Sequence, residues 1–287
     1  MASGKEITGK IQSIGNTMKV TSALEMVSAS KIRKSQSMMS ASRPYLQMMR
    51  RISGHLSKAN PEIRHPFTVE YDTVEKVGYI VVSTDRGLCG GLNNNLFRML
   101  MSDMQEWQTK GADIAMVTFG KKAASFFKNV NVEMMGHVSG LGETPQIEDL
   151  IGAVRIMLEA YRDNDIQRLF IVTNTFVNTM TQDPVIMQML PLPPTEDEEI
   201  GDIWDYIYEP DAQSLLDAVS VRYIEALIYQ AVLENTASEH AARMLAMKNA
   251  TDNAGDLIDE LKLAYNKARQ AAITQEISEI VGGAAAV

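Results

Sequence analysis

The stretch from Ser83 to Asn93 holds the residues best suited to chemistry: the acid Asp85, the glycines Gly87, Gly90 and Gly91, and the only cysteine. It follows an apolar run and precedes a helical one, a place where backbone N–H groups often bind phosphate. The chain has no G-x-x-x-x-G-K-[ST] motif and no G-x-G-x-x-G after a strand. Glycines at tight turns more often serve backbone geometry. We therefore interpret this glycine loop as structural and keep phosphate binding as the alternative.

Cys89 in the glycine loop is a candidate nucleophile, because a helix N-terminus lowers the pKa of a thiol. None of the four histidines (His55, His65, His137 and His240) is near it in sequence, and none shows metal-ligand spacing with it or with another histidine. An inert turn cysteine is the favoured interpretation. We expect no catalytic residue, no metal site and no cofactor in this chain.

The composition indicates a globular protein from a reducing compartment. The chain has 287 residues, 45% of them hydrophobic, and a single cysteine, which excludes a disulfide framework. The first residues lack the apolar core of a signal peptide, and no apolar run approaches the roughly 18 residues of a membrane span. We expect a soluble chain, or one held at a membrane only through partners.

Charge is distributed unevenly along the chain. Residues 1–58 contain ten Lys or Arg against two Asp or Glu, although the net charge of the chain is −9. Such a segment fits a partner of opposite sign. Nucleic acid is disfavoured, because the segment has one aromatic residue, Tyr45, and no DNA-binding pattern. Residues 196–211 carry eight acids and no base, which suits either a solvated surface or a docking patch.

Proline placement predicts two long terminal helices, residues 1–60 and 211–287, around a middle domain of residues 61–210. In the C-terminal segment, steps of three and four residues from Leu216 to Glu279 meet an apolar or aromatic residue at fourteen of nineteen positions. A repeat of 3.5 residues is typical of a coiled coil. Over 64 residues it would span roughly 96 Å, too long for a globular core. His240 lies on this stripe, where a polar residue can set the register.

The N-terminal segment begins with the same spacing, at Ile7, Ile11, Ile14 and Met18. Because the middle domain joins the two ends, we expect the N- and C-terminal helices to pair antiparallel. Pro44 is expected to kink or interrupt the first helix.

The middle domain has the pattern of an α/β fold with a mostly parallel sheet. Strands are predicted at 77–82, 114–119, 132–138 and 169–173, and helices at 96–107, 121–128 and 147–161. We expect Pro184 and the prolines after it to end the ordered pattern.

Three stretches resemble the gamma subunits of the rotary F-type ATP synthases. The first covers Glu6 to Lys34 and includes Ala23-Leu-Glu-Met-Val27, the second is the glycine loop, and the third covers Tyr265 to Gly282 and includes Ile273-Thr-Gln-Glu-Ile277. Their order and spacing match that family. The absence of terminal extensions and of an inserted cysteine pair is more similar to bacterial members.

The resemblance implies a non-catalytic rotor shaft, one copy per complex. A long antiparallel coiled coil would stand inside the ring of α and β subunits, and a Rossmann-like middle domain would meet the epsilon subunit and the c-ring. Proton-driven rotation would then change the catalytic sites, which lie on β, in turn. The expected place is the cytoplasmic face of the bacterial inner membrane, peripheral and reached only through partners, with no nucleic acid.

The family's contact positions fall on named residues of this chain. Contacts with the α/β ring are implied for Leu24, Arg33, Lys34, Arg243, Arg269, Gln270, Thr274 and Glu276. The family usually has methionine where this chain has Leu24, and leucine keeps the apolar bulk. Contacts of the foot with epsilon and the c-ring are implied for Tyr206, Tyr208 and Glu209. The C-terminal Ala284 to Val287 would turn in an apolar bearing.

Overall fold

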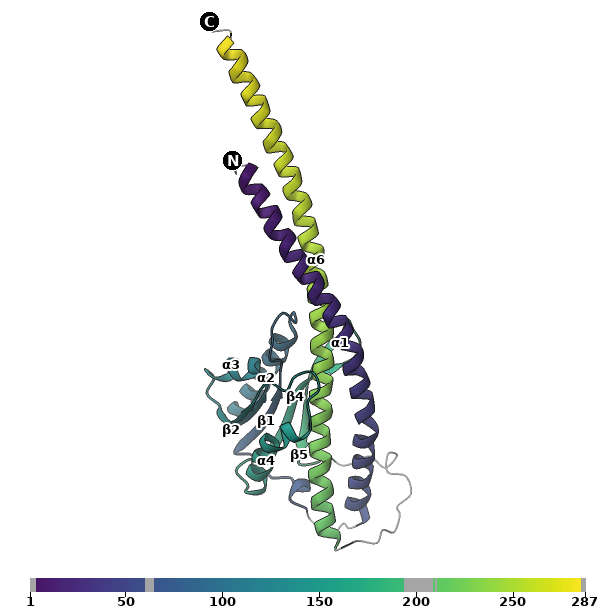
Figure 1. The fold of residues 1–287 in the computed structure, drawn as a ribbon. Coiled ribbons are helices and arrows are strands. Elements are labelled where there is room, and N and C mark those ends of the chain that lie inside the picture. The colour runs from purple at the N-terminus through teal and green to yellow at the C-terminus, as the bar shows by residue number, and fades with distance from the viewer. Residues whose placement is uncertain (1–3, 60–64, 194–208, 210, 285–287) are drawn as a thin grey trace. The chain divides into compact units, whose positions relative to one another are not determined.

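A computed structural model describes residues 4–59, 65–193, 209 and 211–284 (Figure 1). These residues fall into two compact units. Residues 1–29 and 243–287 form one, here called the helical unit, and residues 30–242 form the other, the sheet unit. The units divide the long helices rather than separating them from the middle domain, so the expected boundaries at 60 and 211 remain a prediction. No helix of the described ranges has the length and hydropathy to cross a membrane.

The sheet unit is built on a five-stranded sheet in the order β3-β2-β1-β4-β5. Its first four strands are parallel: β1 (Lys76–Val82), β2 (Asp113–Phe119), β3 (Glu133–Val138) and β4 (Arg168–Phe176). All four were predicted, within three residues at each end. The expected α/β class and mostly parallel sheet are therefore confirmed.

The fifth strand contradicts the expectation that order ends at Pro184. β5 (Gln182–Leu190) pairs antiparallel with β4, and Pro184 lies inside it, opposite Asn174. β5 is at the sheet edge, where a residue without an N–H is tolerated because no strand lies on its outer side. The proline thus marks an edge strand.

Helices cover the two faces of the sheet. Alternate strand residues point to opposite faces. Tyr79 and Val81 pack with α2 (Leu92–Thr109) and α3 (Lys121–Phe127), whereas Ile80 and Val82 pack with α4 (Glu148–Arg162) and with α6 (Ala212–Ala284). The three middle helices were predicted within four residues at each end.

The long helices are α1 (Gly4–Ala59, 56 residues) and α6 (73 residues). α1 runs through Pro44 without a break, so of the expected kink or interruption the interruption was wrong, and the kink stays a prediction. A proline inside a helix removes one backbone hydrogen bond, a local loss that neighbouring packing can offset. α6 begins after Asp211, whose carboxylate accepts from the Ser214 N–H at 2.8 Å, a bond that also lowers the pKa of Asp211.

The two helices pair antiparallel within each unit. In the helical unit the Thr21 and Thr251 hydroxyls lie 2.8 Å apart. In the sheet unit Ser42 donates to Gln230, and Arg43 lies 3.7 Å from Glu234. The antiparallel pairing predicted from the sequence is confirmed.

The apolar stripe of α6 serves different purposes along its length. Between Ile224 and Ala242 fourteen of the nineteen residues are buried and none is exposed, because the sheet lies on one side and α1 on another. From Arg269 to Gly282 every residue is exposed. The expectation of one continuous seam to Glu279 was therefore wrong at its end: α1 begins at Gly4, and Ala272 is the last residue of α6 that lines the groove between the two helices.

The buried His65 ties the start of the middle domain to α6. Its Nδ1 accepts from the Phe67 N–H at 3.2 Å, which caps the short 3-10 helix η1 (Pro66–Thr68), and its Nε2 lies 3.1 Å from Asp217. Arg162 also donates to Asp217. Burial lowers the pKa of His65 below its usual 6.5, although Asp217 opposes this shift.

The lowered pKa of His65 predicts that stability falls as the pH falls through about 6.5, because the unfolded chain binds the proton more readily than the folded one. Substitution His65→Asn keeps an acceptor for the Phe67 N–H but cannot titrate. We expect urea unfolding at pH 7.5 and 5.5 to show a smaller loss of unfolding free energy for this variant than for the parent chain. His137→Asn, at an exposed position, should behave as the parent does; equal losses in all three would contradict the assignment.

Candidate functional site

The glycine loop uses its polar side chains to hold the sheet unit together. The Asp85 carboxylate accepts from the Lys121 N–H at 3.0 Å and from the Gly140 N–H at 2.8 Å. The Ser83 hydroxyl accepts from the Ala123 N–H at 2.9 Å. Asn93 Nδ2 donates to the Thr84 hydroxyl at 2.8 Å. The Asp85 carboxylate thus connects the glycine loop to the start of α3 and to the loop that follows β3.

Backbone geometry explains one of the loop glycines directly. Gly90 has φ +59°, in the left-handed region that favours glycine, while Gly91 precedes α2 as its N-cap and Gly87 is half-buried near Lys122. Cys89 is buried, and its sulfur accepts from Asn93 Nδ2 at 3.4 Å. A buried thiol is poorly placed to attack a substrate. Within the described residues, no group of three or more His, Cys, Asp or Glu could hold a metal ion.

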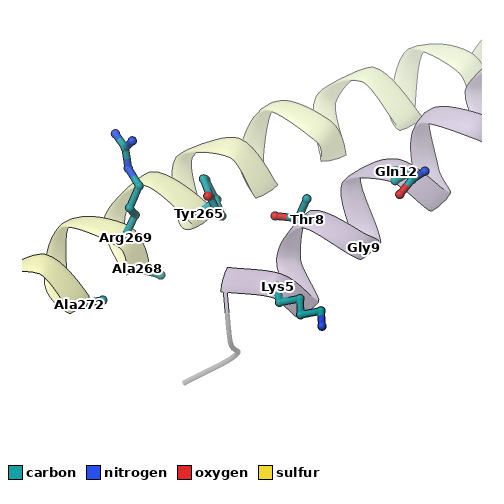
Figure 2. A pocket seen from close by; sticks show the side chains of 8 residues that line it. All are labelled: Lys5, Thr8, Gly9, Gln12, Tyr265, Ala268, Arg269 and Ala272. Carbon is teal, nitrogen blue, oxygen red and sulfur yellow. The ribbon is translucent and has the colours of Figure 1, made fainter.

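In the helical unit, a groove of about 590 Å³ separates the start of α1 from α6. Lys5, Thr8 and Gln12 line it from α1, and Tyr265 and Ala268 from α6 (Figure 2). Arg269 is at its border, and Figure 2 shows its side chain extending away from α1. The guanidinium is thereby presented outward.

Four of the predicted contact residues gather on the exposed end of α6: Arg269, Gln270, Thr274 and Glu276. The Thr274 hydroxyl donates to the Gln270 carbonyl of its own helix at 2.9 Å. Between them runs an apolar stripe that the sequence analysis did not single out: Ile273, Ile277 and Ile280 are 48%, 56% and 71% exposed. Their spacing of four and three residues places them on one helix face. This end of α6, residues 269–282, combines charge and exposed apolar surface, as contact surfaces often do.

The other predicted contact residues are more dispersed. Leu24 and Arg243 belong to the helical unit and are half-buried, whereas Arg33 and Lys34 lie exposed on α1 in the sheet unit. Glu209 is exposed. Tyr206 and Tyr208 lie outside the described residues, as do Ala285 to Val287.

An ion pair that the sequence did not predict links α1 to the loop of residues 139–147. Lys31 Nζ lies 2.5 Å from Glu143 Oε1. Lys31 lowers the pKa of Glu143, with smaller contributions from His240 and Lys34. The loop has no periodic signal that could have identified its partner, and Asp85 accepts from the Gly140 N–H near the start of the same loop.

A double-mutant cycle of Lys31→Gln and Glu143→Gln should give a coupling free energy of about 0.5 kcal/mol, since the pair is partly exposed and solvent screens it. We expect the coupling to shrink in about 1 M NaCl, where the Debye length is roughly 3 Å. Hydrogen exchange should accelerate in residues 139–147 of the Glu143→Gln variant and remain unchanged there in Glu6→Gln, which breaks the pair of Glu6 with Lys10. A coupling that is independent of salt would contradict this account.

Comparison with known proteins gives a consistent result. The family model described as ATP synthase matches residues 3–287. The chain is 59% identical to the ATP synthase gamma chain of Stenotrophomonas maltophilia (strain R551-3) and 58% identical to that of Xanthomonas axonopodis pv. citri (strain 306). Both alignments cover 287 residues, the whole of each chain.

Solved structures with the same fold share far less sequence. One chain of the Euglena gracilis mitochondrial ATP synthase, from the OSCP/F1/c-ring structure, superposes with a TM-score of 0.67 at 19% identity, covering 99% of this chain and 94% of that one. A chain of the Euglena gracilis rotor gives 0.63 at 18%, covering 94% and 98%. These likenesses show the fold, and the matches to full-length bacterial relatives show the family. The chain belongs to the family of ATP synthase gamma chains, the central-stalk subunits of the F-type enzymes.

Proposed function

We propose that this chain is the rotor shaft that passes rotation of the c-ring to the catalytic sites on the β subunits, and that it thereby regulates ATPase activity and proton flow. It contributes no active site of its own. Its partners are the α and β subunits, the epsilon subunit and the c-ring, with one copy in each complex. It lies peripherally on the cytoplasmic face of the bacterial inner membrane and is held there by those partners.

The observation that carries this proposal is the exposed end of α6. Residues 273–282 extend past the part of α6 that α1 covers, and they expose a stripe of isoleucines. An isolated helix with such a stripe is marginal in water and gains stability when a partner buries it. The interior of a ring of α and β subunits would supply that partner, and the nearby Arg269 and Glu276 would supply polar contacts.

The internal use of the glycine loop also supports a non-catalytic role. A phosphate cradle needs backbone N–H groups and cations aimed at a ligand. Here the acid of the loop, Asp85, is engaged by the N–H groups of Lys121 and Gly140, and the Cys89 thiol is buried. The rival proposal, an α/β enzyme with helical arms, therefore has less support.

Deleting residues 274–287 should weaken an assembled complex without abolishing the fold of the sheet unit. We expect this chain alone to be inert, and a mixture with purified α and β subunits to form an active ATPase that loses activity on this deletion. The point variant Ile277→Ala should weaken association about tenfold, since burying such a side chain contributes roughly 1.5 kcal/mol. Ile156→Ala, at a 38% exposed position of α4, is the matched control. ATP turnover by the chain alone, or failure to associate with α and β, would sink the proposal.

Charge reversal should uncouple the complex more than it weakens assembly. The variants Lys34→Glu, Arg243→Glu and Arg269→Glu each replace a cation that could meet an acidic loop of the ring, so proton pumping per ATP hydrolysed is expected to fall. Arg98→Glu, exposed on α2, serves as the control. The measurement is ATP-driven proton uptake by inverted vesicles against the rate of ATP hydrolysis. Parent-like coupling in all three variants would show that these cations do not transmit torque.

A further inference from the structure

A row of buried polar groups joins α6 to β4, the strand next to the edge strand β5, within the sheet unit. The Thr173 hydroxyl donates to the Ala231 carbonyl at 3.1 Å, Asn174 Nδ2 donates to Asn235 Oδ1 at 2.9 Å, and the Ser238 hydroxyl donates to the Asn174 carbonyl at 3.3 Å. The four polar side chains are at most 3% exposed. We call Thr173, Asn174, Asn235 and Ser238 the β4–α6 joint.

The geometry of the joint follows from the two elements that meet in it. Residues 231, 235 and 238 are spaced by four and three, so they lie along one face of α6. Asn174 pairs with Pro184 in the sheet register. The Asn174 carbonyl accepts from Ser238, so its buried acceptor is satisfied by α6.

Elsewhere α6 packs against the sheet through apolar side chains, and it also makes polar contacts with α1, through Gln230 and Glu234, and with His65 and Arg162, through Asp217. Ile224, Ile228 and Val232 belong to the same core cluster as α4 and one face of the sheet. Apolar contact is non-directional, and its strength depends on the area removed from water. A helix held only by such contact could shift along or around its axis at modest cost. Hydrogen bonds need a narrow range of distance and angle, and a buried group that loses its partner is costly.

We propose that the β4–α6 joint positions α6 against the middle domain and prevents slip when torque passes between them. This inference rests on the proposed rotor function. The joint fixes α6 along its axis through residues 231, 235 and 238, and around its axis through the single helix face on which they lie. Rotation of the middle domain is then transmitted to α6 without slip.

The near-isosteric variants Thr173→Val and Ser238→Ala, alone and combined, test the joint in the complete ATP synthase. Loss of one buried hydrogen bond changes the population of a shifted arrangement about fivefold. We expect the combined variant to assemble and to hydrolyse ATP, but to pump fewer protons per ATP than the parent. Hydrogen exchange in residues 231–238 should rise about fivefold for each bond lost.

Two further variants separate positioning from a general effect on stability. Thr173→Ser keeps the hydroxyl and should restore parent-like coupling. Thr236→Val removes a hydroxyl that donates to the Val232 carbonyl of its own helix at 2.8 Å, not to the sheet, and should leave coupling unchanged. Parent-like pumping in the combined variant, or an equal loss in Thr236→Val, would overturn the inference.

Measuring the deletion of residues 274–287 and the joint variants in the same complete ATP synthase separates failure of this inference from failure of the rotor proposal. If deletion of residues 274–287 leaves assembly and ATPase activity intact, the rotor proposal fails. If that deletion acts as expected and the joint variants couple normally, the rotor proposal stands and the joint has no positioning role.

Discussion

The structure depends on α6 having two different neighbours in the sheet unit. Between Ile224 and Ala242 most of its residues are buried and none is exposed, with the sheet and α4 on one side and α1 on another. Neither neighbour alone could bury such a helix, since a single contact covers only one stripe. Because α6 is shared, the sheet and α1 are held to a common element, and their remaining contacts, such as that of Lys31 with Glu143, are supplementary.

Much of this arrangement could be predicted from residue patterns. The four parallel strands are short apolar runs between helical segments, and the pairing of the chain ends followed from their long, proline-poor, periodic sequences. The edge strand β5 was missed because Pro184 outweighed a pattern that does permit an edge strand. The burial of α6 on more than one face was missed because counting apolar residues at steps of three and four describes a single face. Such a count does not show that two partners contact the helix.

Some features of the candidate contact surface could be predicted from the sequence, and others could not. Similarity of motifs identified Arg269, Gln270, Thr274 and Glu276, and the structure gathers them on the exposed end of α6. Similarity of motifs could not indicate that Ile273, Ile277 and Ile280 would also be exposed, because their exposure depends on where α1 stops covering α6. The bonds of Asp85 to Lys121 and Gly140 also escaped prediction, since they join loops far apart in the sequence. Long-range pairings of this kind have no local signal.

Pairing the two ends of the chain also has a consequence for synthesis on the ribosome. Thr21 and its partner Thr251 are 230 residues apart, so α1 emerges long before the segment that will cover it. A nascent helix that exposed a strong apolar stripe during this delay would invite aggregation. The first 58 residues offset their apolar residues with ten basic ones against two acids. That composition keeps the early segment soluble until α6 is made, and it leaves the more apolar partner to be synthesised last, when its binding site is already complete.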